Sequence, residues 1–129
     1  MTRIEDATWA ALRIVAGFMF TFHGVQKILG LLSSHAGPPV GSQMWIGGLI
    51  ELVGGALIAL GLFTRPAAFL ASGTMAVAYF QFHWKFEGGT NLLPIVNDGE
   101  LSVLYCFVFL AIAAKGAGAA SLDRLLRRA

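Results

Sequence analysis

The chain has 129 residues, of which 57% are hydrophobic and only 12% are charged. Its mean hydropathy of +0.72 leaves too little polar surface for a water-soluble globular domain, so the composition predicts a single small integral membrane domain. The net charge of +2 comes without an aromatic-rich basic surface or a phosphate-cradling glycine loop, which argues against a nucleic acid partner.

Four apolar blocks predict four transmembrane helices, in chain order at about residues 9–30, 43–63, 65–84 and 97–114. Each block approaches the roughly 20 residues that a helix needs to cross ~30 Å of hydrocarbon. Pro38 and Pro39 mark a turn-rich first connection, and Thr64-Arg65-Pro66 is a short second one. Asn97 and Glu100 are predicted to cap the last helix. We therefore expect an all-α, four-helix membrane bundle that forms one domain over residues 1–129.

Basic residues predict the orientation of this bundle. One side of the membrane would hold Arg3, Arg13, Arg65, Lys115, Arg124, Arg127 and Arg128, and the other only Lys27 and Lys85. This bias predicts a multi-pass protein of the cell inner membrane with both termini in the cytoplasm. Arg13 is expected to snorkel to the surface. Residues 121–128 predict a short amphipathic helix that lies along anionic membrane lipid.

Ionisable and polar side chains inside the apolar blocks are the candidate functional residues, because a charge near the bilayer centre is costly unless it is paired or hydrated. Helical spacing places His23, Gln26 and Lys27 on one face of the first helix. Glu51 lies on the glycine-rich face of the second helix. We expect these side chains to meet in the outer half of the bundle. His23 with Glu51, and His83 with Glu100, also suggest a weak repeat between the two hairpins.

Several short motifs follow one another in a specific order. They are Phe22-His23-Gly24-Val25-Gln26-Lys27, Glu51-Leu52-Val53-Gly54-Gly55, Gly61-Leu62-Phe63-Thr64-Arg65-Pro66 and Asn97-Asp98-Gly99-Glu100-Leu101. Together they cover most of the chain and resemble the DoxX family. The resemblance implies a small four-helix membrane protein linked to quinone-dependent oxidation, as in the small subunit of a thiosulfate to quinone oxidoreductase.

A quinone head group needs an apolar slot and side chains that exchange protons with its oxygens. We therefore expect His23 and Glu51 to act on a quinone or quinol as the catalytic pair. The wider set of predicted contacts is His23, Gln26, Lys27, Glu51, Tyr79, His83 and Glu100. The sequence has no haem, flavin or iron-sulfur motif, so any further redox centre must belong to a partner protein.

Other interpretations stay open at this point. Glu51 pairing with Lys27 or His23 would fix the helix register without any chemistry. His23, His83, Glu51 and Glu100 would suit a metal ion. The chain would also serve as a noncatalytic anchor or assembly partner for a soluble redox enzyme. Transport by one copy is disfavoured because the inner helix halves have almost no ionisable groups, although a homo-oligomer would supply a path.

Overall fold

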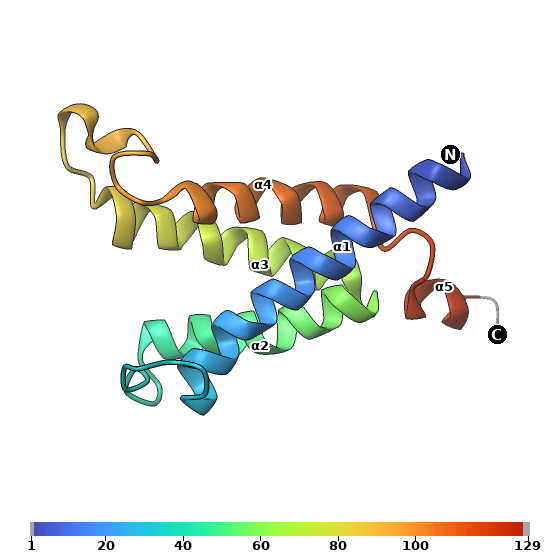
Figure 1. Cartoon of the computed structure of the whole chain (residues 1–129), viewed down its shortest axis with the longest axis horizontal. Coiled ribbons are helices and arrows are strands. Elements are labelled where there is room, and N and C mark those ends of the chain that lie inside the picture. The colour runs from blue at the N-terminus through green and yellow to red at the C-terminus, as the bar shows by residue number, and fades with distance from the viewer. Residues whose placement is uncertain (1, 128–129) are drawn as a thin grey trace.

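The computed structural model describes residues 2–127, and every regular element in that range is helical. The main helices are α1 (Arg3–Gly24), α2 (Gln43–Leu60), α3 (Thr64–Ala78), α4 (Glu100–Lys115) and the short α5 (Leu122–Leu126) (Figure 1). Two π-helical turns extend α1 and α3, namely η1 (Val25–Leu29) and η2 (Tyr79–Trp84), and a 3₁₀ turn, η3 (Gly89–Leu92), lies in the connection to α4. The run Arg3–Leu29 and α2 are long and apolar enough to cross a membrane.

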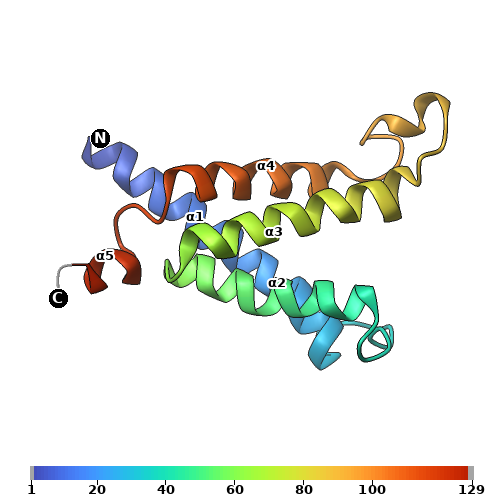
Figure 2. The same cartoon turned by 180° about the vertical axis from the view of Figure 1, so that it is seen from behind.

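The four long helices form two hairpins. α1 packs along α2 and α3 along α4, and the hairpins meet near the α2–α3 turn and then diverge (Figures 1 and 2). Glycine permits the close packing of α1 on α2, because a Cβ on Gly17 would lie 2.5 Å from the backbone nitrogen of Ala59. Where the hairpins join, Phe20, Ile58 and Phe109 are fully buried. The hairpins are therefore close at one end and separated at the other.

The helix boundaries differ from those predicted by hydropathy alone. α1 begins at Arg3 rather than near residue 9, because Thr2 and Glu5 form a capping box ahead of it. α2 ends at Leu60, before Gly61 takes a left-handed backbone with φ of 69°. The predicted Asn97–Glu100 cap is wrong. The side chain of Asn97 accepts a hydrogen bond from the backbone of Gly99 instead, and α4 starts at Glu100.

The two hairpins share one structural feature that the sequence did not reveal. α1 and α3 both end in a π-helical turn, followed by a left-handed residue, Gly30 in the first hairpin and Lys85 in the second. The carboxylates do not match in the same way, because Glu51 lies in the middle of α2 and Glu100 is the first residue of α4. The repeat therefore extends to the helix ends but not to the acidic residues.

Arg13 is fully buried, so the prediction that it snorkels to the surface is wrong. Its guanidinium donates to four backbone oxygens. The acceptors are Ile58 and Ala59 at 2.7 and 2.6 Å, and Ala117 and Ala120 at 2.9 and 2.6 Å. The Ile58 and Ala59 oxygens lie in the last turn of α2, and the Ala117 and Ala120 oxygens belong to the segment after α4. One side chain thus ties three parts of the chain together.

The segment after α4 packs against the other helices and does not lie free along a surface. Asp123 accepts hydrogen bonds from the backbone nitrogens of Phe63 and Thr64 at 2.9 and 3.0 Å, and its own nitrogen donates to Gly61. Leu125 and Leu126 remain exposed, so an apolar face is present as predicted, over a shorter helix. Arg128 of the predicted amphipathic tail lies outside the described residues.

Candidate functional site

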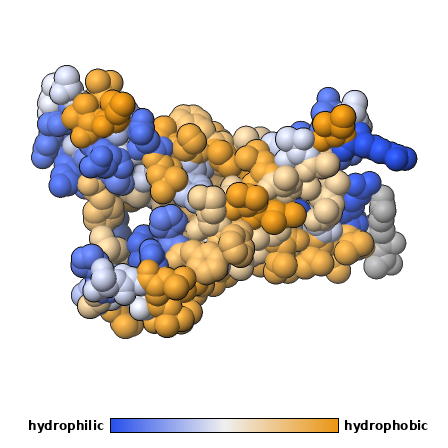
Figure 3. All heavy atoms as spheres, viewed as in Figure 1, coloured by the Kyte–Doolittle hydropathy of each residue, from blue (hydrophilic) through white to orange (hydrophobic). Residues whose placement is uncertain are grey.

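A cavity of about 270 Å³ lies between the two hairpins where they diverge. Figure 3 shows the hollow between the hairpins with hydrophilic atoms along it, whereas the middle of the molecule is mainly apolar. All four long helices or their extensions contribute to its lining. The polar lining residues are His23, Lys27, Glu51, His83, Asp98, Ser102 and Tyr105. The predicted polar cluster therefore exists, with part of its expected membership.

Glu51 is the most deeply buried carboxylate of the cavity, with an exposed fraction of 3%. Its Oε1 accepts a hydrogen bond and ion pair from Lys27 Nζ at 2.7 Å, while Lys27 itself is one-third exposed. Within residues 2–127, Glu51 Oε2 has no hydrogen-bond partner. A buried charge requires compensation, which Lys27 supplies, but a buried oxygen left without a donor is costly. The second oxygen is thus available to a ligand.

Tyr105 is a site residue that the sequence reasoning missed. Its side chain is 6% exposed, and its hydroxyl has no partner among the described residues. The ring stacks on Phe109 at a centroid distance of 5.3 Å and meets the His23 ring edge-on at 6.1 Å. The available signal was a polar-tipped aromatic in the middle of an apolar block, three residues after Ser102 on the same helix face.

The two histidines face the cavity from different hairpins. His23 is half-buried at the end of α1, and His83 is half-buried in η2. His83 Nδ1 lies 3.2 Å from the backbone oxygen of Asn97, which suits a ring protonated on that nitrogen. π-helical turns occur frequently at functional sites, and here the two of them bring Lys27 and His83 to the same cavity.

Three predicted site residues are not part of the described cavity lining. Gln26 is exposed and donates to the backbone oxygen of Leu32 at 2.8 Å. Tyr79 is buried, but its hydroxyl donates to the backbone of Leu92 and accepts from Asn97, so it holds the α3–α4 connection. Glu100 is exposed at the start of α4.

The alternative prediction of a metal site requires that His23, His83, Glu51 and Glu100 lie together, and they do not. Among residues 2–127, no group of three or more histidine, cysteine or carboxylate side chains is arranged to hold a metal ion. Glu100 lies away from the cavity that contains His23, Glu51 and His83. The expected two-histidine, two-carboxylate set is therefore not brought together.

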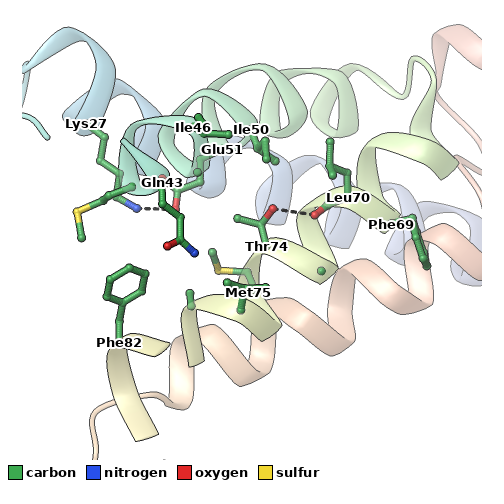
Figure 4. A pocket seen from close by; sticks show the side chains of 15 residues that line it. Lys27, Gln43, Ile46, Ile50, Glu51, Phe69, Leu70, Thr74, Met75 and Phe82 are labelled. Carbon is green, nitrogen blue, oxygen red and sulfur yellow. Dashed lines mark hydrogen bonds and ion pairs between the residues drawn. The ribbon is translucent and has the colours of Figure 1, made fainter. Parts of the chain in front are cut away.

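An apolar groove of about 360 Å³ runs between α2 and α3 and reaches the same ion pair (Figure 4). Phe69 and Leu70 lie at one end, and Lys27 and Phe82 at the other. The groove and the cavity share four lining residues, which are Lys27, Glu51, Met75 and Ala78. The Lys27–Glu51 pair therefore stands between an apolar surface groove and a polar interior.

Comparison with known proteins gives a consistent family. The DoxX family model matches residues 8–84, which include His23, Lys27, Glu51 and His83. An uncharacterized protein of Haemophilus influenzae is 47% identical over 117 residues, covering 88% of this chain and 87% of that protein. The inner membrane protein YqjF of Escherichia coli is 32% identical over 99% of this chain and 98% of its own length. No solved structure matches the chain. On the family match and these two relatives, the chain belongs to the DoxX family of membrane proteins.

Proposed function

We propose that the chain crosses the membrane four times, with both termini in the cytoplasm. Large apolar side chains point outward from every long helix. Examples are Phe18, Val53, Phe69 and Phe107, which are between 50% and 68% exposed. Such exposure suits a lipid environment and would be costly in water. The 16 residues of α4 span ~24 Å, so the bilayer around it would be thinned or the adjoining segments would complete the crossing.

The distribution of basic residues supports the proposed orientation. The end at which α1 begins and α4 finishes carries Arg3, Arg65, Lys115, Arg124 and Arg127, and the diverging end carries Lys27 and Lys85. Five against two in short flanking segments fits the positive-inside pattern. The polar cavity then lies in the half of the bundle that faces away from the cytoplasm.

We further propose that this cavity binds the head group of a quinone or quinol. The observation that carries the proposal is Glu51 Oε2, a buried carboxylate oxygen without a partner beside a cavity that His23 and Tyr105 also line. A ring-shaped head group with two opposed oxygens fits this arrangement. One hydroxyl of the quinol would donate to Glu51 Oε2 beside His23, and the opposite ring oxygen would accept from the Tyr105 hydroxyl. A volume of 270 Å³ is below the ~300–1,000 Å³ of drug-sized pockets and suits a single ring.

In this proposal the chain is the quinone-binding subunit of a membrane oxidoreductase system. Reduction of a quinone to a quinol takes two electrons and two protons. The electrons would come from the redox centre of a partner protein. Glu51 and His23 would pass the protons to the ring oxygens, because carboxyl and imidazole groups act as general acids and bases when they lie within hydrogen-bonding reach of the reacting atoms. Lys27 would stabilise the carboxylate each time it loses its proton.

Glu51→Gln tests the proposal because it keeps the shape of the side chain and removes its charge and proton exchange. In lipid nanodiscs we expect the variant to bind a short-chain quinone in its reduced, quinol form about tenfold more weakly or worse, because the hydroxyl donor loses its charged acceptor. Binding is measured at equilibrium with empty nanodiscs as background. Glu87→Gln is the matched control, because Glu87 is exposed in the loop before η3. Unchanged quinone binding by folded Glu51→Gln would overturn the assignment.

A noncatalytic anchor is the second candidate, and one surface favours it. Arg65, Lys115, Arg124 and Arg127 surround a recess of about 420 Å³ at the proposed cytoplasmic end. An acidic surface of a soluble redox enzyme would dock there by charge complementarity. If anchoring were the whole function, Glu51→Gln would leave the activity of the assembled system intact, and Glu51 and Lys27 would serve only to join α1 to α2.

A further inference from the structure

Glycines within the long helices differ in what surrounds them. At Gly17 and Gly55 an added Cβ would lie 2.5 and 2.6 Å from backbone atoms of the facing helix, so these glycines permit close helix packing. Gly47 and Gly73 face the groove between α2 and α3. At Gly47 the nearest neighbour of a Cβ is Thr74 Cγ2 at 4.0 Å, and at Gly73 there is none within 4 Å. Helix packing does not require glycine at these two positions. Their effect is to leave the groove open.

Polarity changes along this groove. Phe69 and Leu70 line the end near the α2–α3 turn, and Lys27, Gln43 and Glu51 line the other end (Figure 4). Phe69 and Ala78 are separated by ~14 Å along α3 at 1.5 Å per residue. The groove is therefore long and apolar with one polar end. This pattern matches an amphiphile that has a hydrocarbon chain and one polar head group.

The polar end of the groove selects the kind of head group. Lys27 and Glu51 neutralise each other, so an anionic or zwitterionic head group gains little there. The remaining hydrogen-bonding atom is Glu51 Oε2, which is buried and has no partner among the described residues, in a residue that lines both the groove and the cavity. An uncharged head group with a hydroxyl that donates to this oxygen, as a quinol has, matches this end better than a phospholipid head group does.

We propose that the α2–α3 groove holds the hydrocarbon chain of a membrane-dissolved quinone and admits the molecule sideways from the lipid. The inference rests on the proposed quinone site and adds how the ligand reaches it and which part of the ligand the groove recognises. The head group passes the Lys27–Glu51 pair into the cavity, and the chain lies over Gly47 and Gly73 toward Phe69.

The test fills the groove without disturbing helix contacts. Gly73→Leu places a side chain in the open space, and helix propensity favours the change. Gly47→Leu fills the groove from the opposite wall and is the second variant. Val53→Leu is the matched control, because Val53 is half-exposed on α2 outside the groove. Each protein, in nanodiscs of phosphatidylethanolamine and phosphatidylglycerol, is titrated under reducing conditions with two ligands in their quinol form. One is a benzoquinone that has no side chain, and the other is the same ring carrying a decyl chain.

We compare each ligand with itself across the variants, so its partition into lipid cancels. We expect Gly73→Leu and Gly47→Leu to weaken the decyl quinone about tenfold and to leave the chainless ring within about twofold of the parent protein. Val53→Leu should change neither. Equal effects on both ligands, or no effect on either, would overturn the groove assignment while the head-group site stands. The groove assignment would also be overturned if the groove variants displaced bound phospholipid without weakening the decyl quinone. Failure of the parent protein to bind either ring would refute the proposed function and this inference with it.

Discussion

Arg13 shows how one buried charge can organise a small membrane protein. Its guanidinium satisfies four backbone oxygens that would otherwise end helices or turns without donors. Two of these oxygens follow Arg13 by more than 100 residues in the chain. Within residues 2–127 no carboxylate forms an ion pair with Arg13, so backbone carbonyls make all of its direct polar contacts. Arginine suits this role better than lysine, because its planar group carries five donors.

Removal of the Arg13 side-chain charge should therefore be severe. We expect Arg13→Met to lower the free energy of unfolding by roughly 3–5 kcal/mol, since buried carbonyls lose their donors. The comparison is Arg65→Met. Arg65 also donates to three backbone oxygens near the end of α4, but it is exposed, so water replaces it at a cost of about 1 kcal/mol. Thermal unfolding of both variants in one detergent measures the difference. Equal losses of unfolding free energy would contradict the conclusion that Arg13 joins three parts of the chain.

Sequence reasoning identified some of the residues that line the cavity and missed others, for physical reasons. His23, Lys27 and Glu51 were found because an ionisable group in an apolar helix stands out locally. Tyr105 was missed because its burial depends on how the two hairpins pack. Arg13 was misjudged for a related reason. A charge near a helix end usually snorkels, and only the distant segment around Ala117 and Ala120 encloses it.

At the scale of elements, α3 receives its N-terminal cap from a distant part of the chain. The residue before the helix, Phe63, has a left-handed backbone and no side-chain acceptor. Asp123, about 60 residues later, accepts from the free amides of Phe63 and Thr64. Partial burial raises the pKa of Asp123, but these backbone hydrogen bonds and nearby Arg127 outweigh it. The net pKa lies below the ordinary value of 3.8.

This lowered pKa predicts how the stability of the fold depends on pH. Because the folded-state pKa lies below the unfolded value, the Asp123 carboxylate stabilises the fold above pH 3.8, and the contribution is lost as the pH falls through the folded pKa. We expect Asp123→Ala to cost about 1 kcal/mol at pH 7, as removal of a capping side chain does. The difference from the parent protein should shrink below pH 4. Thermal midpoints measured from pH 7 to pH 3 check this, and a constant difference would contradict it.

Hydropathy predicted the long helices but not their ends. A mean over many residues identifies an apolar block such as residues 43–60, whereas the boundary depends on a few hydrogen bonds at Thr2, Gly61 or Gly99. The π-helical turns η1 and η2 were also invisible, because one extra residue per turn leaves no clear mark on hydrophobic periodicity. They nevertheless help set the direction in which Lys27 and His83 point.

At the scale of the whole molecule, two hairpins are held together at one end and apart at the other. Arg13, Asp123 and the segment after α4 fix the closed end. At the divergent end a polar cavity remains, with the apolar α2–α3 groove beside it and a second apolar groove between α1 and α4 that also reaches Tyr105. The fold thus combines an end that is fixed by hydrogen bonds with a polar cavity that apolar grooves approach, whereas the sequence alone predicted only a cluster of polar residues.

The most direct test of the proposed quinone site is to identify what the protein retains when gently extracted in its native lipids. Native mass spectrometry of the parent protein should detect one quinone or quinol with its hydrocarbon chain per chain of protein, and folded Glu51→Gln should have lost it. A parent protein that carries only phospholipid, or a Glu51→Gln variant that keeps the same quinone, would contradict the proposed site between His23, Glu51 and Tyr105.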